Sequence, residues 1–158
     1  LEVRLAKSIL NIATENNYNV SIIDPCCGIG TVVIEGRAMN LNISGYEIND
    51  VVSNYGNENL ESFGFKGDIQ NINMLESREK FDVAILDIPY GQFSLTTKDE
   101  QLQLLRKTRE LAETQVIVSM EDISTTLQEC EFDIIDKVEL AKSNSFSRFI
   151  YKTKKSRL

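Results

Sequence analysis

The sequence predicts an α/β fold, with a mostly parallel β-sheet and helices on both of its faces. Short apolar runs typical of buried strands alternate along the chain with segments whose apolar residues recur at helical spacing. This alternation favours parallel strands, because each helix returns the chain to the same end of the sheet. The run at residues 81–87 is the clearest strand, since residues 83–86 are all apolar.

The first half of the chain is expected to begin with a helix and to continue with strand–helix units. Leu1, Leu5, Ile9 and Ile12 recur at helical spacing, which predicts the opening helix. The expected strands are residues 20–24, 43–47 and 65–68, and the expected helices are residues 31–40 and 50–62.

The second half is expected to complete a seven-stranded sheet. Its predicted strands are residues 81–87, 115–120, 132–138 and 147–151, and its predicted helix is residues 98–113. The last two strands are joined by a short turn near residues 143–145 with no helix between them, so the final strand is expected to be antiparallel.

Length and composition favour one domain over residues 1–158 and exclude several kinds of chemistry. The chain has no histidine, which excludes Ser-His-Asp and Cys-His catalysis and zinc sites that need imidazole. Its three cysteines lack C-x-x-C spacing, which argues against a metal knuckle and a disulfide framework. No run of about 18 apolar residues is present, so no membrane span is expected.

A glycine-rich turn follows the first predicted strand in the stretch Asp24-Pro25-Cys26-Cys27-Gly28-Ile29-Gly30-Thr31. Such a turn between strand and helix lets a ligand approach the backbone closely. Val33 stands where a dinucleotide fingerprint has its third glycine, and no lysine follows as in a P-loop. The carboxylate of Asp24 instead suits a cationic ligand, although a tight turn without a ligand explains the glycines equally well.

Three carboxylates are expected to end three successive strands. Glu47 follows Gly28 by 19 residues, a spacing that suits an acceptor for ribose hydroxyls. Asp68 is expected at the end of the third strand, where it could reach an adenine edge. Together with Asp24, they would suit an adenosine joined to a cationic amino-acid group.

The fourth predicted strand ends in Asp87-Ile88-Pro89-Tyr90-Gly91. A strand followed by D-P-C-C-G-x-G-T, then a strand-end Glu, then G-D and D-x-P-Y-G resembles the class I S-adenosylmethionine-dependent methyltransferases. More narrowly, it resembles the THUMP-associated RNA guanine-N2 methyltransferases, and the resemblance covers almost the whole chain. It implies a Rossmann-like fold and transfer of a methyl group from S-adenosylmethionine to the N2 amine of a guanosine in RNA.

The resemblance also implies roles for the matched residues. Asp24, Gly28 and Gly30 would frame the methionine end of the cofactor and Glu47 would hold its ribose. Asp68, with Ile69 beside it, would face the adenine. Asp87, Pro89 and Tyr90 would form the acceptor site, with Tyr90 stacking on the target base. The remaining expected cofactor contacts are Pro25, Ile48 and Asp87 itself. This chain departs from the pattern at Ile88, where many relatives have proline.

Charge is unevenly distributed and bears on the expected partners. The net charge is −7, of which residues 137–158 carry +6 and residues 1–136 carry −13. An acidic body is a poor binder of phosphates, whereas the relatives carry an N-terminal THUMP-type region that binds RNA. We therefore expect a catalytic fragment whose RNA substrate, most simply transfer RNA, is bound mainly by a missing N-terminal region. No metal is required, and a cytoplasmic location is expected.

Other functions remain open at this stage. The substrate could be ribosomal RNA, or the target could be an adenine N6 amine or a protein glutamine. Relatives with those amine targets often carry asparagine at the position of Asp87, which favours guanine. A cofactor-binding module without activity, acting within an RNA-modifying complex, is a further alternative.

Overall fold

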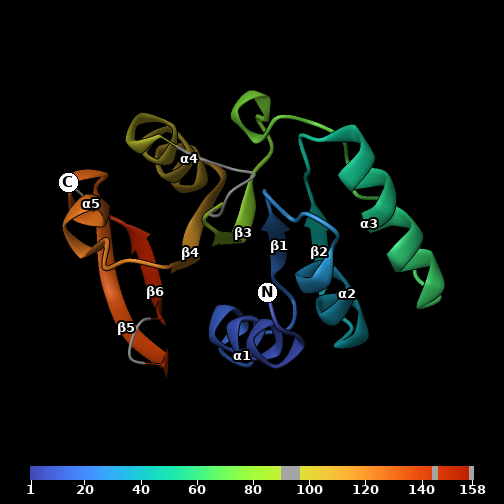
Figure 1. Ribbon diagram of the computed structural model, residues 1–158, viewed down its shortest axis with the longest axis horizontal. Helices are drawn as coiled ribbons and strands as arrows, with labels where there is room; N and C mark the ends of the chain where they lie inside the picture. The colour runs from blue at the N-terminus through green and yellow to red at the C-terminus, as the bar shows by residue number, and fades with distance from the viewer. Residues whose placement is uncertain (90–96, 144–145, 157–158) are drawn as a thin grey trace.

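A computed structural model describes residues 1–89, 97–143 and 146–156 (Figure 1). Within these residues, six strands form one sheet in the order β2-β1-β3-β4-β6-β5. The strands are β1 (Ser21–Asp24), β2 (Asn42–Gly45), β3 (Phe81–Asp87), β4 (Ala112–Ser119), β5 (Phe132–Ser143) and β6 (Phe146–Lys155).

The sheet is parallel on one side and antiparallel on the other. β1 pairs in parallel with both β2 and β3, and β3 pairs in parallel with β4. β6 runs antiparallel to both β4 and β5, which confirms the predicted antiparallel strand at the end of the chain. After β1 the chain adds β2 on one side of β1, and β3 then pairs with β1 on its other side. The topological switch point therefore lies between β1 and β3, where ligands bind in such sheets.

Helices cover both faces of the sheet, as predicted. α1 and α4 both contact β3 and β4, and Figure 1 shows them on opposite sides of these strands. No helix within the described ranges is long and apolar enough to cross a membrane. The helices are α1 (Val3–Thr14), α2 (Thr31–Ala38), α3 (Asp50–Ser62), the 3-10 helix η1 (Met74–Glu76), α4 (Lys98–Leu111) and α5 (Ser124–Glu129).

Alternate side chains of the central strands fill the two layers of the core. In β3, Val83 and Ile85 join the cluster formed with α1 and α2, whereas Leu86 packs with Leu105 of α4 on the other face. All four are buried. Because a strand in this position has no solvent-facing side, its sequence is a continuous apolar run, which explains why it was the clearest strand to predict.

The structure corrects three details of the prediction. The expected strand at residues 65–68 is wrong, because none of these residues pairs with the sheet and the following Gln70 forms only a single bridge, with Tyr46. The described sheet therefore has six strands rather than seven. The helices α5 and η1 were not predicted. The expected turn at residues 143–145 lies mostly outside the described residues.

A close contact between α2 and β2 gives a stability prediction with an unusual sign. A Cβ atom added to Gly36 would lie 2.7 Å from Cγ2 of Ile43, closer than real Cβ atoms come. Helix propensity alone predicts that Gly36→Ala stabilises the protein by about 1 kcal/mol. We expect the reverse, a loss of about 1–3 kcal/mol, because the added methyl overpacks the interface.

Urea unfolding of Gly36→Ala measures this effect as a lower midpoint. The matched experiment repeats the substitution in an Ile43→Ala background, where the smaller side chain makes room. There the same change should no longer destabilise the protein, since the two sites are in contact and their effects are coupled. A midpoint higher than that of the wild type in the single variant would contradict the packing argument.

Candidate functional site

The glycine turn is a left-handed connection between β1 and α2. Gly28 and Gly30 have φ angles of 54° and 86°, which L-amino acids with side chains adopt poorly. Gly30 is the N-cap of α2, and a Cβ atom there would lie 3.0 Å from Cδ1 of Ile69. A Cβ atom on Gly28 would meet nothing within 4 Å. Gly30 thus packs against the protein, whereas Gly28 faces open space that a ligand can approach.

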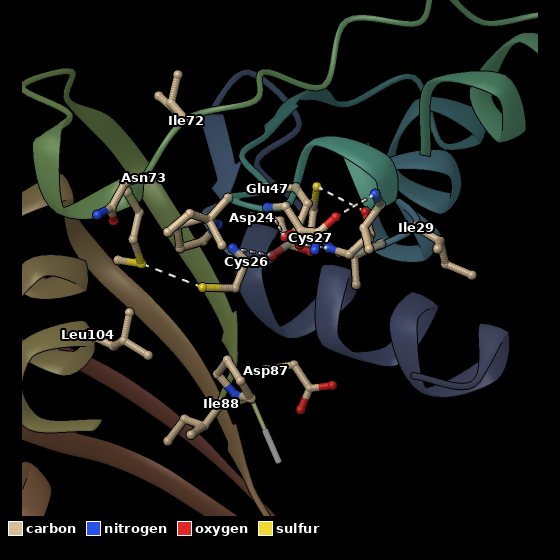
Figure 2. Close-up of a pocket in the computed structure, with 18 of the residues that line it drawn as sticks. Asp24, Cys26, Cys27, Ile29, Glu47, Ile72, Asn73, Asp87, Ile88 and Leu104 are labelled. Atoms are coloured by element: carbon tan, nitrogen blue, oxygen red, sulfur yellow. Dashed lines mark hydrogen bonds between the residues drawn. The ribbon is translucent and has the colours of Figure 1, made fainter. Parts of the chain in front are cut away.

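A cavity of about 1030 Å³ opens beside this turn. It lies beyond the carboxyl ends of β1 and β3, at the switch point of the sheet, as such folds lead one to expect. Figure 2 shows the side chains that surround it. The lining residues come from segments 24–32, 47–52, 72–75, 87–89 and 100–104, together with Leu1.

Most of the predicted site residues meet in this cavity. Asp24, Pro25 and Gly28 line it from the turn, and Glu47 and Ile48 line it from the segment after β2. Asp87 and Pro89 line it from the end of β3. Gly30 does not line the cavity, and it packs against Ile69 instead. Tyr90 lies outside the described residues, so its predicted stacking role remains a prediction.

Asp24 is the most deeply buried of the acidic residues in the cavity. It ends β1, is 4% exposed, and accepts a hydrogen bond from the backbone N–H of Cys26 at 3.3 Å. Burial raises the pKa of Asp24 to about 7, and the negative charges of Asp87 and Glu47 act in the same direction. At neutral pH this carboxyl group is therefore poised between its two protonation states.

Asp87 presents an unsatisfied acceptor to the site. Its Oδ1 is buried and finds no hydrogen-bond partner among the described residues. Burial raises the pKa of Asp87, while the positive charges of the Leu1 amino group and of Arg148 oppose this shift. Buried carboxylate oxygens are normally paired, and an exception at the end of a strand, beside a cavity, indicates a group that meets a ligand. Figure 2 shows this carboxylate extending away from Ile88.

Glu47 connects the segment after β2 with the glycine turn. Its Oε2 accepts a hydrogen bond from the backbone N–H of Gly28 at 3.0 Å, and its Oε1 accepts one from Asn49 at 2.8 Å. Each carboxylate oxygen can accept more than one hydrogen bond, so both retain capacity for hydroxyl groups of a ligand. The side chain is thereby fixed at the edge of the cavity before any ligand binds.

Asp68 and Ile69 do not line the cavity, so their predicted place beside the adenine remains a prediction. Asp68 lies before the bridge at Gln70 rather than at a strand end. It pairs with Arg37 of α2, whose Nη2 lies 3.1 Å from its Oδ1. Ile69 is buried against the glycine turn. The paired acid is held by a residue 31 positions away in the sequence, a contact that no local pattern reveals.

Two walls of the cavity were missed in the sequence. The first is the segment after the expected third strand, which contributes Ile72, Asn73, Met74 and Leu75. Asn71 holds this segment beside the site, because its Nδ2 donates hydrogen bonds to the carbonyls of Glu47 and Ile48 at 3.0 Å each. The asparagines at positions 71 and 73 are the sequence feature that could have indicated this wall. The second wall is α4, which contributes Glu100, Gln103 and Leu104.

The cysteines of the chain are free thiols, and the two in the glycine turn have raised pKa values. Cys26, Cys27 and Cys130 are free. Burial and the nearby acidic side chains raise the pKa of Cys26 to about 12, and burial likewise raises the pKa of Cys27. Thiols react as thiolates, so both remain unreactive at neutral pH. Cys26 instead packs its sulfur 3.6 Å from that of Met74.

The basic residues near the end of the chain are mostly engaged elsewhere. Lys137 pairs with Asp122 at 2.6 Å, and Lys155 pairs with Glu113 at 2.8 Å. Lys152 is only 6% exposed and pairs with Glu15 at the end of α1. These contacts make the three lysines part of the domain's own ion pairs and leave them less available to a polyanion.

Comparison with known proteins connects this arrangement to a family. Residues 1–147 match the family described as RMKL-like, methyltransferase domain. Two curated relatives are tRNA (guanine(10)-N2)-dimethyltransferases from Methanothermobacter thermautotrophicus and Pyrococcus abyssi. The first is 28% identical over 107 residues, which is 66% of this chain and 32% of the relative. The second is 25% identical over 164 residues, which is 96% of this chain and 49% of the relative.

A solved structure of another methyltransferase has the same fold. Magnesium protoporphyrin IX methyltransferase from Synechocystis PCC 6803, crystallised with bound SAM, superposes with a TM-score of 0.78 at 14% identity. The superposition covers 96% of this chain and 79% of that one. The fold prediction, a Rossmann-like sheet with helices on both faces, is therefore confirmed.

Proposed function

Because the chain belongs to the RMKL-like methyltransferase domain family, we propose that it transfers a methyl group from S-adenosylmethionine to the N2 amine of a guanosine in RNA. Transfer RNA is the proposed substrate. The observation that carries this proposal is the Oδ1 of Asp87, which has no hydrogen-bond partner among the described residues and lies beside the cavity at the glycine turn. The two curated relatives support guanine N2 as the target.

The donor set of the cavity fits S-adenosylmethionine. This ligand combines an adenosine, an amino-acid group and a positively charged sulfur, and the cavity is lined by the carboxylates of Asp24, Glu47 and Asp87 and by an open backbone turn. In the proposal, Glu47 holds the ribose hydroxyls and Ile48, which is 68% exposed, covers one side of the nucleoside. Asp24, Pro25 and Gly28 hold the amino-acid end. When bound, the cofactor supplies an electrophilic methyl group.

The chain's own part in the chemistry is to hold and activate the acceptor amine. The N2 amine of guanine is a poor nucleophile because its lone pair is delocalised into the ring. Oδ1 of Asp87 and the carbonyl of Ile88 accept hydrogen bonds from the amine hydrogens, which favours the pyramidal, reactive form of the nitrogen. The carboxylate of Asp87 also stabilises the positive charge that develops on nitrogen. Pro89 and Tyr90 form the platform under the base.

RNA affinity is proposed to reside mainly in a region outside this chain. The chain spans about a third of one curated relative and about half of the other. Its net charge of −7 opposes binding to a polyanion, and three of its C-terminal lysines, Lys137, Lys152 and Lys155, already form ion pairs. We therefore propose the activity on transfer RNA, and a location in the cytoplasm, for the protein together with such an RNA-binding region.

The proposal is tested by binding and transfer measured on the same preparation. Calorimetry should show binding of S-adenosylhomocysteine, the demethylated product. A labelled methyl group should then appear in bulk transfer RNA with enzyme in excess, and a nucleoside digest should place it in N2-methylguanosine. Label in N6-methyladenosine would contradict the base assignment. Binding without transfer, in the longer protein as well, would favour a cofactor-binding module without activity.

A further inference from the structure

The cavity contains several acidic groups and no basic side chain. Asp24, Glu47, Asp87 and Glu100 line it, and no lysine or arginine does so within the described ranges. The positive charge of the Leu1 amino group lowers the pKa of both Asp24 and Asp87, but less than burial raises it. Like charges held together in a poorly solvated space disfavour full ionisation of the group. One of the acids is therefore expected to keep a proton when the cavity holds no cation.

Asp24 is the acid that the geometry selects. It is 4% exposed, and its carboxylate accepts a long hydrogen bond, 3.3 Å, from the Cys26 N–H. The charged groups that act on it come from each neighbouring element: Asp87 from the end of β3, Glu47 from the segment after β2 and the Leu1 amino group from the segment before α1. The two thiols of the turn, Cys26 and Cys27, are neutral.

Asp87 completes the arrangement from the adjacent strand. β1 and β3 are paired neighbours in the sheet, so their terminal acids, Asp24 and Asp87, face the same cavity. Oδ1 of Asp87 has no partner among the described residues, and Arg148 acts on Asp87 alone of the two acids. The pair thus lacks a full set of counter-charges until a cation enters.

We propose that, below neutral pH, Asp24 is protonated in the free protein and releases its proton when a ligand with an added positive charge enters the cavity. The pair formed by Asp24 and Asp87 then distinguishes the sulfonium donor from its neutral thioether product. The inference rests on the proposed function, because the donor is the one named there. The proton balance is simple: the Asp24 carboxylic acid becomes a carboxylate, and the proton passes to solvent.

The consequence is a preference between donor and product that depends on pH. S-Adenosylmethionine and S-adenosylhomocysteine share the same amino and carboxylate groups, so any proton that both displace cancels in the ratio of their dissociation constants. The charge on sulfur is therefore the difference that determines how this ratio depends on pH. Because Asp24 has a pKa of about 7, the preference for the donor should increase as pH rises. Linkage sets the limit at about tenfold per pH unit for one proton.

Calorimetry on the wild-type protein tests the proton release directly. Titrations with the donor, the thioether product and sinefungin, an analogue with an amine in place of the sulfonium, should be run in phosphate and in Tris at several pH values. The two cationic ligands should release more protons than the thioether below about pH 7. The ratio of product to donor dissociation constants should rise by up to about tenfold per unit up to that pH and then level off.

The Asp24→Asn variant provides a readout that needs no ligand. In the wild type, the unfolded Asp24 ionises near pH 4 and the folded one near pH 7. Its contribution to stability is therefore fully present below about pH 4 and is lost as pH rises towards 7. The melting temperature of Asp24→Asn relative to wild type should rise across this window. Asp133→Asn, which removes an exposed acid on β5, should show no such trend.

The outcomes separate this inference from the proposed function. In Asp24→Asn, the ratio of dissociation constants should become independent of pH, and the donor should bind more weakly than to wild type at pH 8. Binding of both ligands to wild type with a ratio independent of pH would overturn the inference and leave the proposed function standing. A failure of both ligands to bind at any pH would overturn both.

Discussion

Replacing Asp87 with alanine is expected to lower the rate of methyl transfer by about 10²–10³-fold and to leave S-adenosylhomocysteine binding nearly unchanged. Asp87 ends β3 beside the cavity, with a buried carboxylate oxygen that has no partner among the described residues. A contact with the target amine strengthens as positive charge develops on nitrogen. An interaction made mainly in the transition state lowers the barrier and adds little to ground-state binding. Single-turnover methylation beside cofactor calorimetry measures both quantities.

Asp87→Asn is the matched control, because it keeps the shape of the side chain and removes its charge. Its rate should lie between those of the wild type and of Asp87→Ala. In the wild type, the rate should fall as pH is lowered through the pKa of Asp87, which burial raises above its usual range. A near wild-type rate in Asp87→Ala would mean that the acceptor site lies elsewhere, and the guanine-N2 proposal would lose its main support.

Replacing Glu47 with alanine should weaken S-adenosylhomocysteine binding by at least tenfold. Hydrogen bonds to a charged group contribute about 1.5–3 kcal/mol each, and the proposal assigns two ribose hydroxyls to this carboxylate. The loss has a second source, because Glu47 also accepts hydrogen bonds from the backbone of Gly28 and Asn49. Without these contacts the glycine turn is less firmly held in its binding conformation.

A second variant separates the two effects of Glu47. Glu47→Gln keeps one acceptor oxygen, so it should preserve part of the contact with the turn while losing the charge that faces the hydroxyls. Thermal melting without ligand reports on the turn, and calorimetry reports on the ribose. Affinity for S-adenosylhomocysteine equal to that of the wild type in Glu47→Ala would show that the ribose is held elsewhere.

The sequence predicted elements whose signals are local. The helix at residues 50–62 matches α3 residue for residue, because Asn49 caps it by accepting a hydrogen bond from Val52 N–H at 3.1 Å. The helix α5 was missed, since it has only six residues and no side-chain cap. β5 and β6 are longer than the predicted strands at residues 132–138 and 147–151. Many of the residues of β5 are exposed and polar, so the periodic pattern ends before the strand does.

The candidate site was predictable to the extent that strand ends determine it. The two acids Asp24 and Asp87 end adjacent parallel strands, so topology alone brings them together. The position of Asp68 could not be predicted from a strand end. Its position depends on where the segment meets β2, and its partner Arg37 becomes its neighbour only in the folded chain. The contribution of α4 to the cavity likewise follows from packing rather than from any motif.

The pairing of β1 with β3 has a consequence for how the protein folds. The partners Ser21 and Asp82, which are hydrogen-bonded at the start of this pair, lie 61 residues apart in the chain, whereas β5 and β6 are neighbours in sequence and pair antiparallel. Closing so long a loop is slow compared with forming a hairpin. Asp24 and Asp87 therefore meet late, once most of the chain is in place. A ligand of this cavity stabilises the finished structure, so it slows unfolding and leaves the rate of folding almost unchanged.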